Sequence, residues 1–201
     1  MYFHFESKEG LARAVIDEGS RRFESLYLRR LDSRTPALES LIDISYATIA
    51  AQQKNSLITA AFRLATEVGD CRGTNTAIFA DWMFGSRALA HRTVSDGDIR
   101  DDVNPDDVGD LIVEMVFGIL CLTADLGHHG RLASHVTSCW TLLLPALVDS
   151  PKISYFRQFL ARRLSYLENL GIPRIQSTPH EAPRAARGLL APSTSEAALA
   201  P

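Results

Sequence analysis

Apolar residues in this chain recur at the three- and four-residue spacing of an α-helix in one segment after another. In the first such segment, which starts at Lys8, the residues Leu11, Val15, Phe23 and Tyr27 fall near one helical face. No segment shows the strict alternation of apolar and polar residues that is typical of a half-buried strand. The sequence also lacks internal repeats and a glycine-rich phosphate loop. It therefore predicts an all-α fold.

Start and stop signals divide the chain into about seven helices. Proline fits the first helical turn, and it follows a capping residue at Thr35-Pro36, Asn104-Pro105 and Ser150-Pro151. Pro145 lies inside an apolar segment and is expected to kink or end its helix, because it lacks a backbone donor. We expect helices over residues 8–31, 36–53, 56–68, 75–94, 105–126, 131–148 and 151–171.

Length and composition favour one globular domain followed by a tail. The chain has 201 residues, of which 46% are hydrophobic, and this is enough for one well-buried core. Residues 172–201 are rich in proline, alanine and serine without periodicity, and we expect them to be disordered. The net charge of -3, from 21 basic and 24 acidic residues, gives the chain no general attraction to nucleic acid or anionic membranes. Any contact with nucleic acid must therefore be local.

Cysteine usage and hydropathy indicate a cytoplasmic protein. Cys71, Cys121 and Cys139 are odd in number and widely spaced, and we expect all three to be buried free thiols in the core. The longest apolar stretch, from Met115 to Leu122, is far shorter than the roughly 20 residues that a membrane span requires. We expect no membrane association.

The segment "LIVEMVFGILCLTADL" is apolar on nearly every side of the helix that it predicts. A helix in the outer layer of a monomer buries one stripe and exposes the rest. This segment therefore predicts that a partner surface covers part of the helix.

Neither a metal site nor an active site is indicated. The acidic stretch from Asp96 to Asp110 resembles a calcium loop only in composition, because Arg100 would fall on a ligand position and Asp101 on the position that needs glycine. His135 and Cys139 share a helical face, but the paired spacing of a zinc site is lacking. There is no activated nucleophile, carboxylate pair or cofactor fingerprint. We expect no metal, no cofactor and no enzymatic activity.

The opening string "YFHFESKEGLARAVID" resembles the junction that closes the DNA-binding domain of TetR-family transcriptional regulators. The resemblance implies that residues 1–6 are a remnant of a helix-turn-helix domain and that residues 7–171 form a helical ligand-binding and dimerisation domain. It further implies phosphate contacts by Tyr2 and Lys8, and Lys8 also lies at a helix N-terminus, which favours an anion. In the chain as it stands, we expect both residues to belong to a frayed terminus, and we expect the phosphate contacts only when the missing segment is restored.

The same resemblance implies two further helices, and nearly all of the recognition helix, upstream of Met1. We expect Met1 to be an internal residue of a longer protein that binds operator DNA through that region. The alternative is a genuine short form, a dimer that does not bind DNA and that sequesters ligand or a full-length relative.

A second resemblance points to one subfamily of these regulators. The strings "LITAAFRLATEVGD", "FADWMFGSRALA" and "LLLPALV" are similar to the γ-butyrolactone receptors of antibiotic-producing bacteria. In that subfamily a tryptophan placed as Trp82 lies against the lactone, although a core role for Trp82 stays open. Arg63 and Thr66 are its candidate polar neighbours in the pocket. The resemblance implies a homodimeric repressor that a small ligand releases from DNA.

Overall fold

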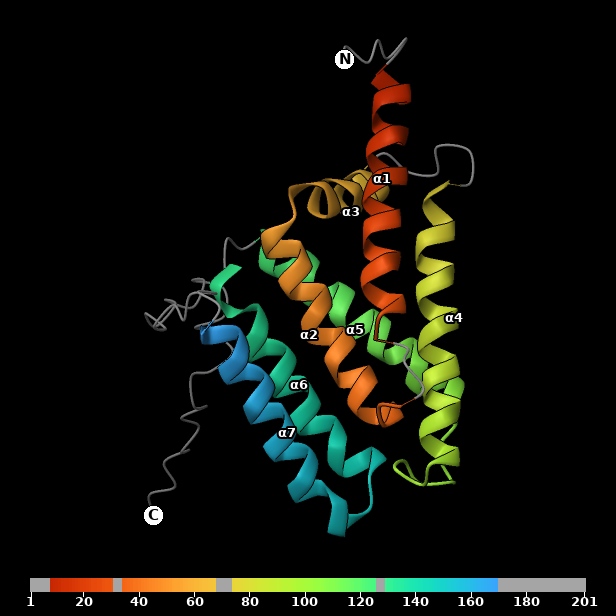
Figure 1. The fold of residues 1–201 in the computed structure, drawn as a ribbon, viewed down its shortest axis with the longest axis vertical. Coiled ribbons are helices and arrows are strands. Elements are labelled where there is room, and N and C mark those ends of the chain that lie inside the picture. The colour runs from red at the N-terminus through yellow and green to blue at the C-terminus, as the bar shows by residue number, and fades with distance from the viewer. Residues whose placement is uncertain (1–7, 31–33, 68–73, 126–128, 170–201) are drawn as a thin grey trace, which may run out of the picture.

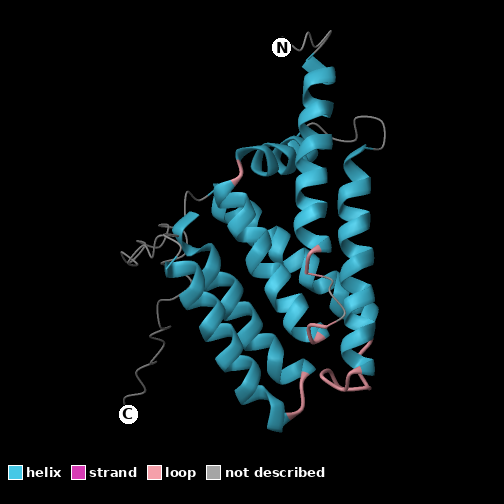
Figure 2. Cartoon of the chain, in the orientation of Figure 1, coloured by secondary structure: helices cyan, strands magenta, loops and turns pink. Residues whose placement is uncertain are grey.

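The computed structural model describes residues 8–30, 34–67, 74–125 and 129–169. These ranges contain seven α-helices, a short 3-10 helix and no strand, which confirms the predicted fold class (Figures 1 and 2). The helices are α1 (Lys8–Leu28), α2 (Ala37–Lys54), α3 (Ser56–Glu67), α4 (Thr74–Ser95), α5 (Pro105–Asp125), α6 (Leu132–Leu147) and α7 (Ser150–Asn169), and the 3-10 helix is His129–Arg131. The expected tail and residues 1–6 lie outside the described residues.

Most helix ends lie close to the predicted ones. The Asn104 side chain caps α5, since its Oδ1 accepts a hydrogen bond of 3.1 Å from the Asp106 backbone N–H. Pro36 is the N-cap residue of α2, so this helix begins one position later than expected. Pro145 does not end α6, which continues to Leu147 before the extended residue Val148. The missing donor is tolerated because the helix ends within a turn of the proline.

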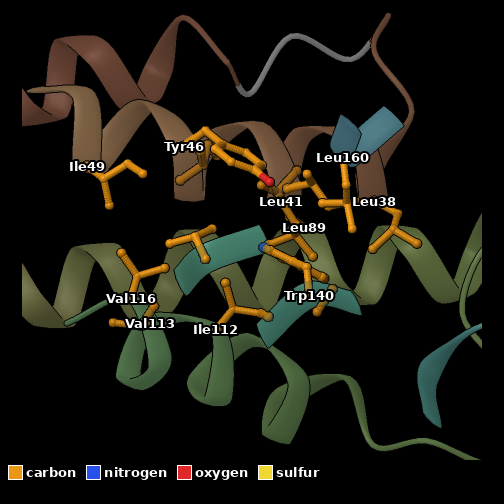
Figure 3. Close-up of a cluster of buried hydrophobic side chains, with 14 of the residues drawn as sticks. Leu38, Leu41, Tyr46, Ile49, Leu89, Ile112, Val113, Val116, Trp140 and Leu160 are labelled. Carbon is orange, nitrogen blue, oxygen red and sulfur yellow. The ribbon is translucent and has the colours of Figure 1, made fainter. Parts of the chain in front are cut away.

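The hydrophobic core is built around α2, which contacts each of the other six described α-helices. It lies near the centre of the molecule, with α1 and α4 on one side and α6 and α7 on the other (Figure 1). Its buried residues occupy every side of the helix, and Leu38, Leu41 and Ile49 are fully buried. Figure 3 shows these side chains in one buried cluster with Leu89 of α4 and Ile112 of α5. A helix buried all round is expected at the centre of a domain.

Two polar contacts fix α6 against α2. Trp140 is fully buried, and its Nε1 donates a hydrogen bond of 3.3 Å to Ser45 Oγ. The Tyr46 hydroxyl lies 2.6 Å from Thr137 Oγ1. Because buried polar groups without partners are costly, these two pairs specify how the two helices meet.

The long helix α1 extends beyond the body of the protein at its N-terminal end (Figure 1). Its buried residues begin only at Ile16, and Leu11, which the periodicity places on the apolar face, is 45% exposed. Farther along, Gly19 allows α1 to cross α3 closely, since a Cβ there would lie 2.8 Å from the Leu57 carbonyl oxygen and would also overlap the Ala61 Cβ.

Ion pairs attach the C-terminal end of α1 to α2 and α7. Asp43 of α2 accepts a hydrogen bond of 3.3 Å from Arg30 Nε through Oδ2, and its Oδ1 is ion-paired with Arg163 of α7. All three side chains are mostly buried. One carboxylate thus links the end of α1 to the α6–α7 pair.

The prediction that the cysteines are buried in the core was wrong for the described residues, because Cys121 and Cys139 are only half-buried, toward the outer sides of α5 and α6. As expected, neither of these two cysteines forms a disulfide bond. Cys71 lies outside the described residues. Among the described helices, none combines the length and the apolar character needed to cross a bilayer.

Candidate functional site

Trp82 lies at the meeting point of three helices. Its ring packs edge to face against Phe23 of α1 and Phe62 of α3, with ring centroids 5.3 and 6.1 Å away. Phe23 and Phe62 also contact each other at 5.2 Å. Such tilted contacts are the favoured geometry for aromatic rings, so the three side chains form a tight apolar triangle.

The triangle continues toward α5. Phe79, one turn before Trp82 on α4, packs against Phe62 at 5.9 Å and against Phe117 of α5 at 5.1 Å. Both contacts are edge to face. We call Phe23, Phe62, Phe79, Trp82 and Phe117 the aromatic cluster. It connects α1, α3, α4 and α5.

Tyr27 closes the cluster on the side of α1. Its ring lies 6.4 Å from Phe23, and its hydroxyl is 3.3 Å from Ser86 Oγ on α4. A Cβ at Gly85 would lie only 2.6 Å from the tyrosine ring, so the missing side chain of this glycine lets α1 and α4 meet here. Burial raises the pKa of Tyr27 to about 12, against a smaller lowering by the Ser86 hydrogen bond. The phenol is therefore neutral at physiological pH.

The indole N–H of Trp82 is the polar atom that this arrangement leaves without a hydrogen bond. Trp82 is 2% exposed, and its buried Nε1 has no hydrogen-bond partner among the described residues. By contrast, the N–H of the other tryptophan, Trp140, is satisfied by Ser45. An unpaired buried donor costs about 1–3 kcal/mol, and such a group in a native structure calls for an explanation. A carbonyl oxygen of a small ligand would satisfy it.

The structure describes the side chains of two of the three sequence-predicted pocket residues, Trp82 and Arg63. Trp82 is buried in the aromatic cluster, whereas the Arg63 side chain is exposed although its neighbour Phe62 is buried. Adjacent helical residues point in different directions, so Arg63 does not share the face of Phe62. Thr66 belongs to α3, but its side chain lies outside the described part.

Of the two predicted phosphate contacts, the structure describes only Lys8. Lys8 is the first residue of α1 and is exposed, at the end of the helix that extends from the body. Tyr2 lies outside the described residues. Among the described residues, no three His, Cys, Asp or Glu side chains gather in a group that could hold a metal ion.

Sequence reasoning missed most of the aromatic cluster. The signal was present in part, since Phe23 with Tyr27 and Phe79 with Trp82 are spaced to share a helical face. That spacing is equally typical of an ordinary core, and it does not reveal which helices bring their rings together.

Comparisons with known proteins agree with this architecture. Residues 35–149 match the family model described as "Tetracyclin repressor-like, C-terminal domain". The A-factor receptor protein of Streptomyces griseus is 27% identical over 158 residues, which cover 78% of this chain and 54% of that protein. The chain thus spans about half the length of this curated relative.

Solved structures show the same fold. A γ-butyrolactone receptor described as ArpA-like superposes with a TM-score of 0.69 at 23% identity, covering 82% of this chain and 78% of that one. The TetR-family protein CprB of Streptomyces coelicolor, in complex with its operator sequence, gives a TM-score of 0.68 at 24% identity with the same coverage. TylP, a TetR regulator from Streptomyces fradiae, gives 0.61 at 24% identity, covering 89% of this chain and 76% of that one.

Proposed function

The chain belongs to the family of the tetracyclin repressor-like C-terminal domain, and from this membership we propose that it is the ligand-binding and dimerising part of a transcriptional repressor. The ligand is a small molecule of the γ-butyrolactone class, and it releases the protein from operator DNA. The relatives described as γ-butyrolactone receptors, and the neighbour solved with its operator, support this assignment.

The unpaired N–H of Trp82 is the observation that carries the ligand proposal. A lactone offers an uncharged carbonyl acceptor for this donor, and its acyl substituent is apolar like the surrounding rings. A site lined by aromatic side chains with one oriented donor binds such a molecule without burying a charge. Arg63 is exposed and has no part in this proposal.

The aromatic cluster also provides a route from ligand to DNA. Phe23 contacts Trp82 directly and belongs to α1, whose N-terminal end carries the exposed Lys8. A ligand that fits beside Trp82 in only one position of α1 shifts the population toward that position. We propose that Lys8, together with Tyr2, contacts phosphates of the operator and that the ligand-bound position of α1 is incompatible with this contact.

We further propose that the protein acts as a homodimer through the outer sides of α5 and α6. On α5, Leu111 and Leu122 are 41% and 65% exposed, and a Cβ added at Gly118 between them meets no atom within 4 Å. On α6, Leu142 is 79% exposed, and the helix contains no Asp, Glu, Lys or Arg. An exposed apolar surface of this kind marks an interaction site, and the absence of charge lets two copies meet without repulsion.

Ligand binding tests the proposal. We expect an acyl-substituted γ-butyrolactone to bind the wild-type chain in calorimetry, and Trp82→Phe, which keeps a ring but removes the N–H, to weaken binding about tenfold. Trp140→Phe is the matched control, because the N–H that it removes is already bonded within the protein. The proposal fails if no such lactone binds, or if the two substitutions weaken binding equally.

A further inference from the structure

The outward side of α4 carries an exposed aromatic residue that neither the core nor the proposed ligand site uses. Phe84 is 77% exposed, and Ala80 and Ala88, one turn before and after it, are exposed as well. Trp82 and Gly85, by contrast, face the interior. Figure 1 shows α4 at an edge of the molecule, so this side of the helix is open.

Contacts between α4 and α5 show which part of α5 lies beside Phe84. Arg87 makes a two-pronged ion pair with Asp110, with both N–O distances 2.6 Å, and one turn later on α4 His91 Nε2 lies 2.9 Å from Asp106 Oδ1. In the other direction Phe79 packs on Phe117. The two helices are therefore antiparallel.

The turn of α5 between Asp110 and Phe117 consequently lies level with Phe84. This turn carries the exposed Glu114. We call the resulting surface the acidic α4–α5 face; its members are Ala80, Asp81, Phe84, Arg87, Ala88 and His91 of α4, and Asp106, Asp107, Asp110 and Glu114 of α5.

The charge of this face is strongly negative. It holds five carboxylates, at Asp81, Asp106, Asp107, Asp110 and Glu114, against the single guanidinium of Arg87. The Arg87 guanidinium already forms an ion pair with Asp110. The face therefore attracts cations and repels nucleic acid and anionic lipid.

Charge also argues against a second copy as the occupant. Two acidic faces brought together would repel each other, whereas the outer side of α6 is free of charged residues. A large exposed aromatic side chain surrounded by carboxylates is complementary to a segment that is both cationic and apolar.

We propose that the acidic α4–α5 face is a docking surface for a cationic, amphipathic helix of a partner protein. An aliphatic or aromatic side chain of the partner packs on Phe84, and its lysines or arginines pair with Asp106, Asp107 and Glu114. The surface is separate from the proposed ligand site, because Trp82 lies on the buried side of the same helix and is 2% exposed.

Two synthetic peptides of about five helical turns serve as probes. One combines leucine on one face with lysine on the other, and the second replaces each leucine by serine at the same charge. We expect the leucine–lysine peptide to bind the full chain in calorimetry and to shift NMR signals of α4 and of the N-terminal half of α5. We expect the serine–lysine peptide to bind at least about tenfold more weakly.

Variants separate the apolar and the ionic parts of the interaction. Phe84→Ser should weaken binding about tenfold, and the double substitution Asp106→Asn, Asp107→Asn should weaken it and reduce its salt dependence. Tyr166→Ser is the matched control, since Tyr166 is another exposed aromatic residue, 54% exposed, and lies on α7 outside the acidic α4–α5 face. Circular dichroism verifies that each variant is folded.

Three outcomes would overturn the proposal: equal binding of the two peptides, unchanged binding by Phe84→Ser, or NMR shifts that map away from α4 and α5. Loss of self-association in Phe84→Ser during sedimentation would also overturn it, because the face would then belong to a contact between copies. None of these outcomes depends on lactone binding, so failure here leaves the proposed function intact.

Discussion

At the scale of single residues, glycines and polar atoms determine how closely the helices meet. Gly19 and Gly85 stand where a Cβ would overlap α3 and Tyr27 respectively, so each permits a helix crossing that alanine would block. Ser45 satisfies the N–H of one buried tryptophan, Trp140. The other, Trp82, has no such neighbour, and this difference distinguishes a structural tryptophan from a candidate ligand-binding one.

Substitution of Gly19 tests the closeness of the α1–α3 crossing. Gly19→Ala should destabilise the protein by about 1–3 kcal/mol in urea denaturation, although alanine favours a helix over glycine by about 1 kcal/mol. Ser25→Ala on the exposed side of α1 is the control and should change stability by less than about 0.5 kcal/mol. A stabilised Gly19→Ala variant would show that the helices can separate at no cost.

Two buried phenols should limit stability in alkali. Burial raises the pKa values of Tyr27 and Tyr46 to about 12, from an ordinary value of 10.0. Because their folded-state pKa values exceed the unfolded ones, their contribution is complete below pH 10 and is lost as the pH rises toward 12. Each phenol should account for about 2–3 kcal/mol of this loss.

The measurement is the unfolding free energy as a function of pH. Tyr27→Phe and Tyr46→Phe should each flatten the alkaline decline, whereas Tyr166→Phe, at a 54% exposed position, should not. If the variant that carries both Tyr27→Phe and Tyr46→Phe loses as much unfolding free energy in alkali as the wild type, the loss belongs to other groups.

At the scale of elements, α5 and α6 each leave leucine side chains exposed outside the core. The sequence predicted a partner surface for α5 because apolar residues surround it. The structure locates the open side, at Leu111, Gly118 and Leu122, and adds Leu142 of α6. The open position of Gly118 is useful experimentally, because a Cβ added there meets no atom of the chain within 4 Å.

Gly118→Leu should therefore leave the fold intact and weaken self-association. The added side chain meets no atom of its own chain within 4 Å at its Cβ, but it would occupy space that a second copy needs. We expect sedimentation to show at least about a tenfold weaker dimer, and a similar effect for Leu142→Glu, which places charge in the proposed interface. Phe84→Ser, at an equally exposed residue outside this surface, should have no effect. A dimer unaffected by both substitutions would place the interface elsewhere.

At the scale of the whole molecule, α1 is packed into the core toward its C-terminal end and is exposed toward the other. Phe23 and Tyr27 pack on the aromatic cluster, and Arg30 binds Asp43, which in turn binds Arg163 of α7. The residues before Ile16 contribute nothing to the core. A helix held in this way can pivot about its C-terminal end, which is the motion that the proposed ligand response requires.

Asp43→Asn tests this attachment. The substitution removes the charge that two arginines share, and should lower the unfolding free energy by about 1–3 kcal/mol. It should also increase hydrogen exchange in the last two turns of α1 more than elsewhere. Asp81→Asn, at an exposed position, is the control. If hydrogen exchange in α1 is unchanged in Asp43→Asn, the aromatic contacts alone are enough to hold the helix.

Much of the fold could be predicted from the sequence because its signals are local. Helical periodicity and the Asn104 cap depend on neighbours within a turn or two, and they predicted seven helices with nearly correct ends. The opening motif and the pattern around Trp82 indicated the family that residues 35–149 confirm. The errors arose where burial was inferred from apolar character alone, at Cys121, Cys139 and Leu11.

Contacts between distant parts of the chain were decided only by the tertiary structure. The sequence alone determined an all-α chain with Trp82 on an amphipathic helix. It did not determine that Phe23, Phe62 and Phe117, from three other helices, would form one cluster with it and Phe79. Nor could it show that the Trp82 N–H lacks a partner, that Arg63 faces solvent, or that Phe84 lies among carboxylates of α5. These properties depend on the rotation of each helix against its neighbours, which packing fixes and local sequence does not.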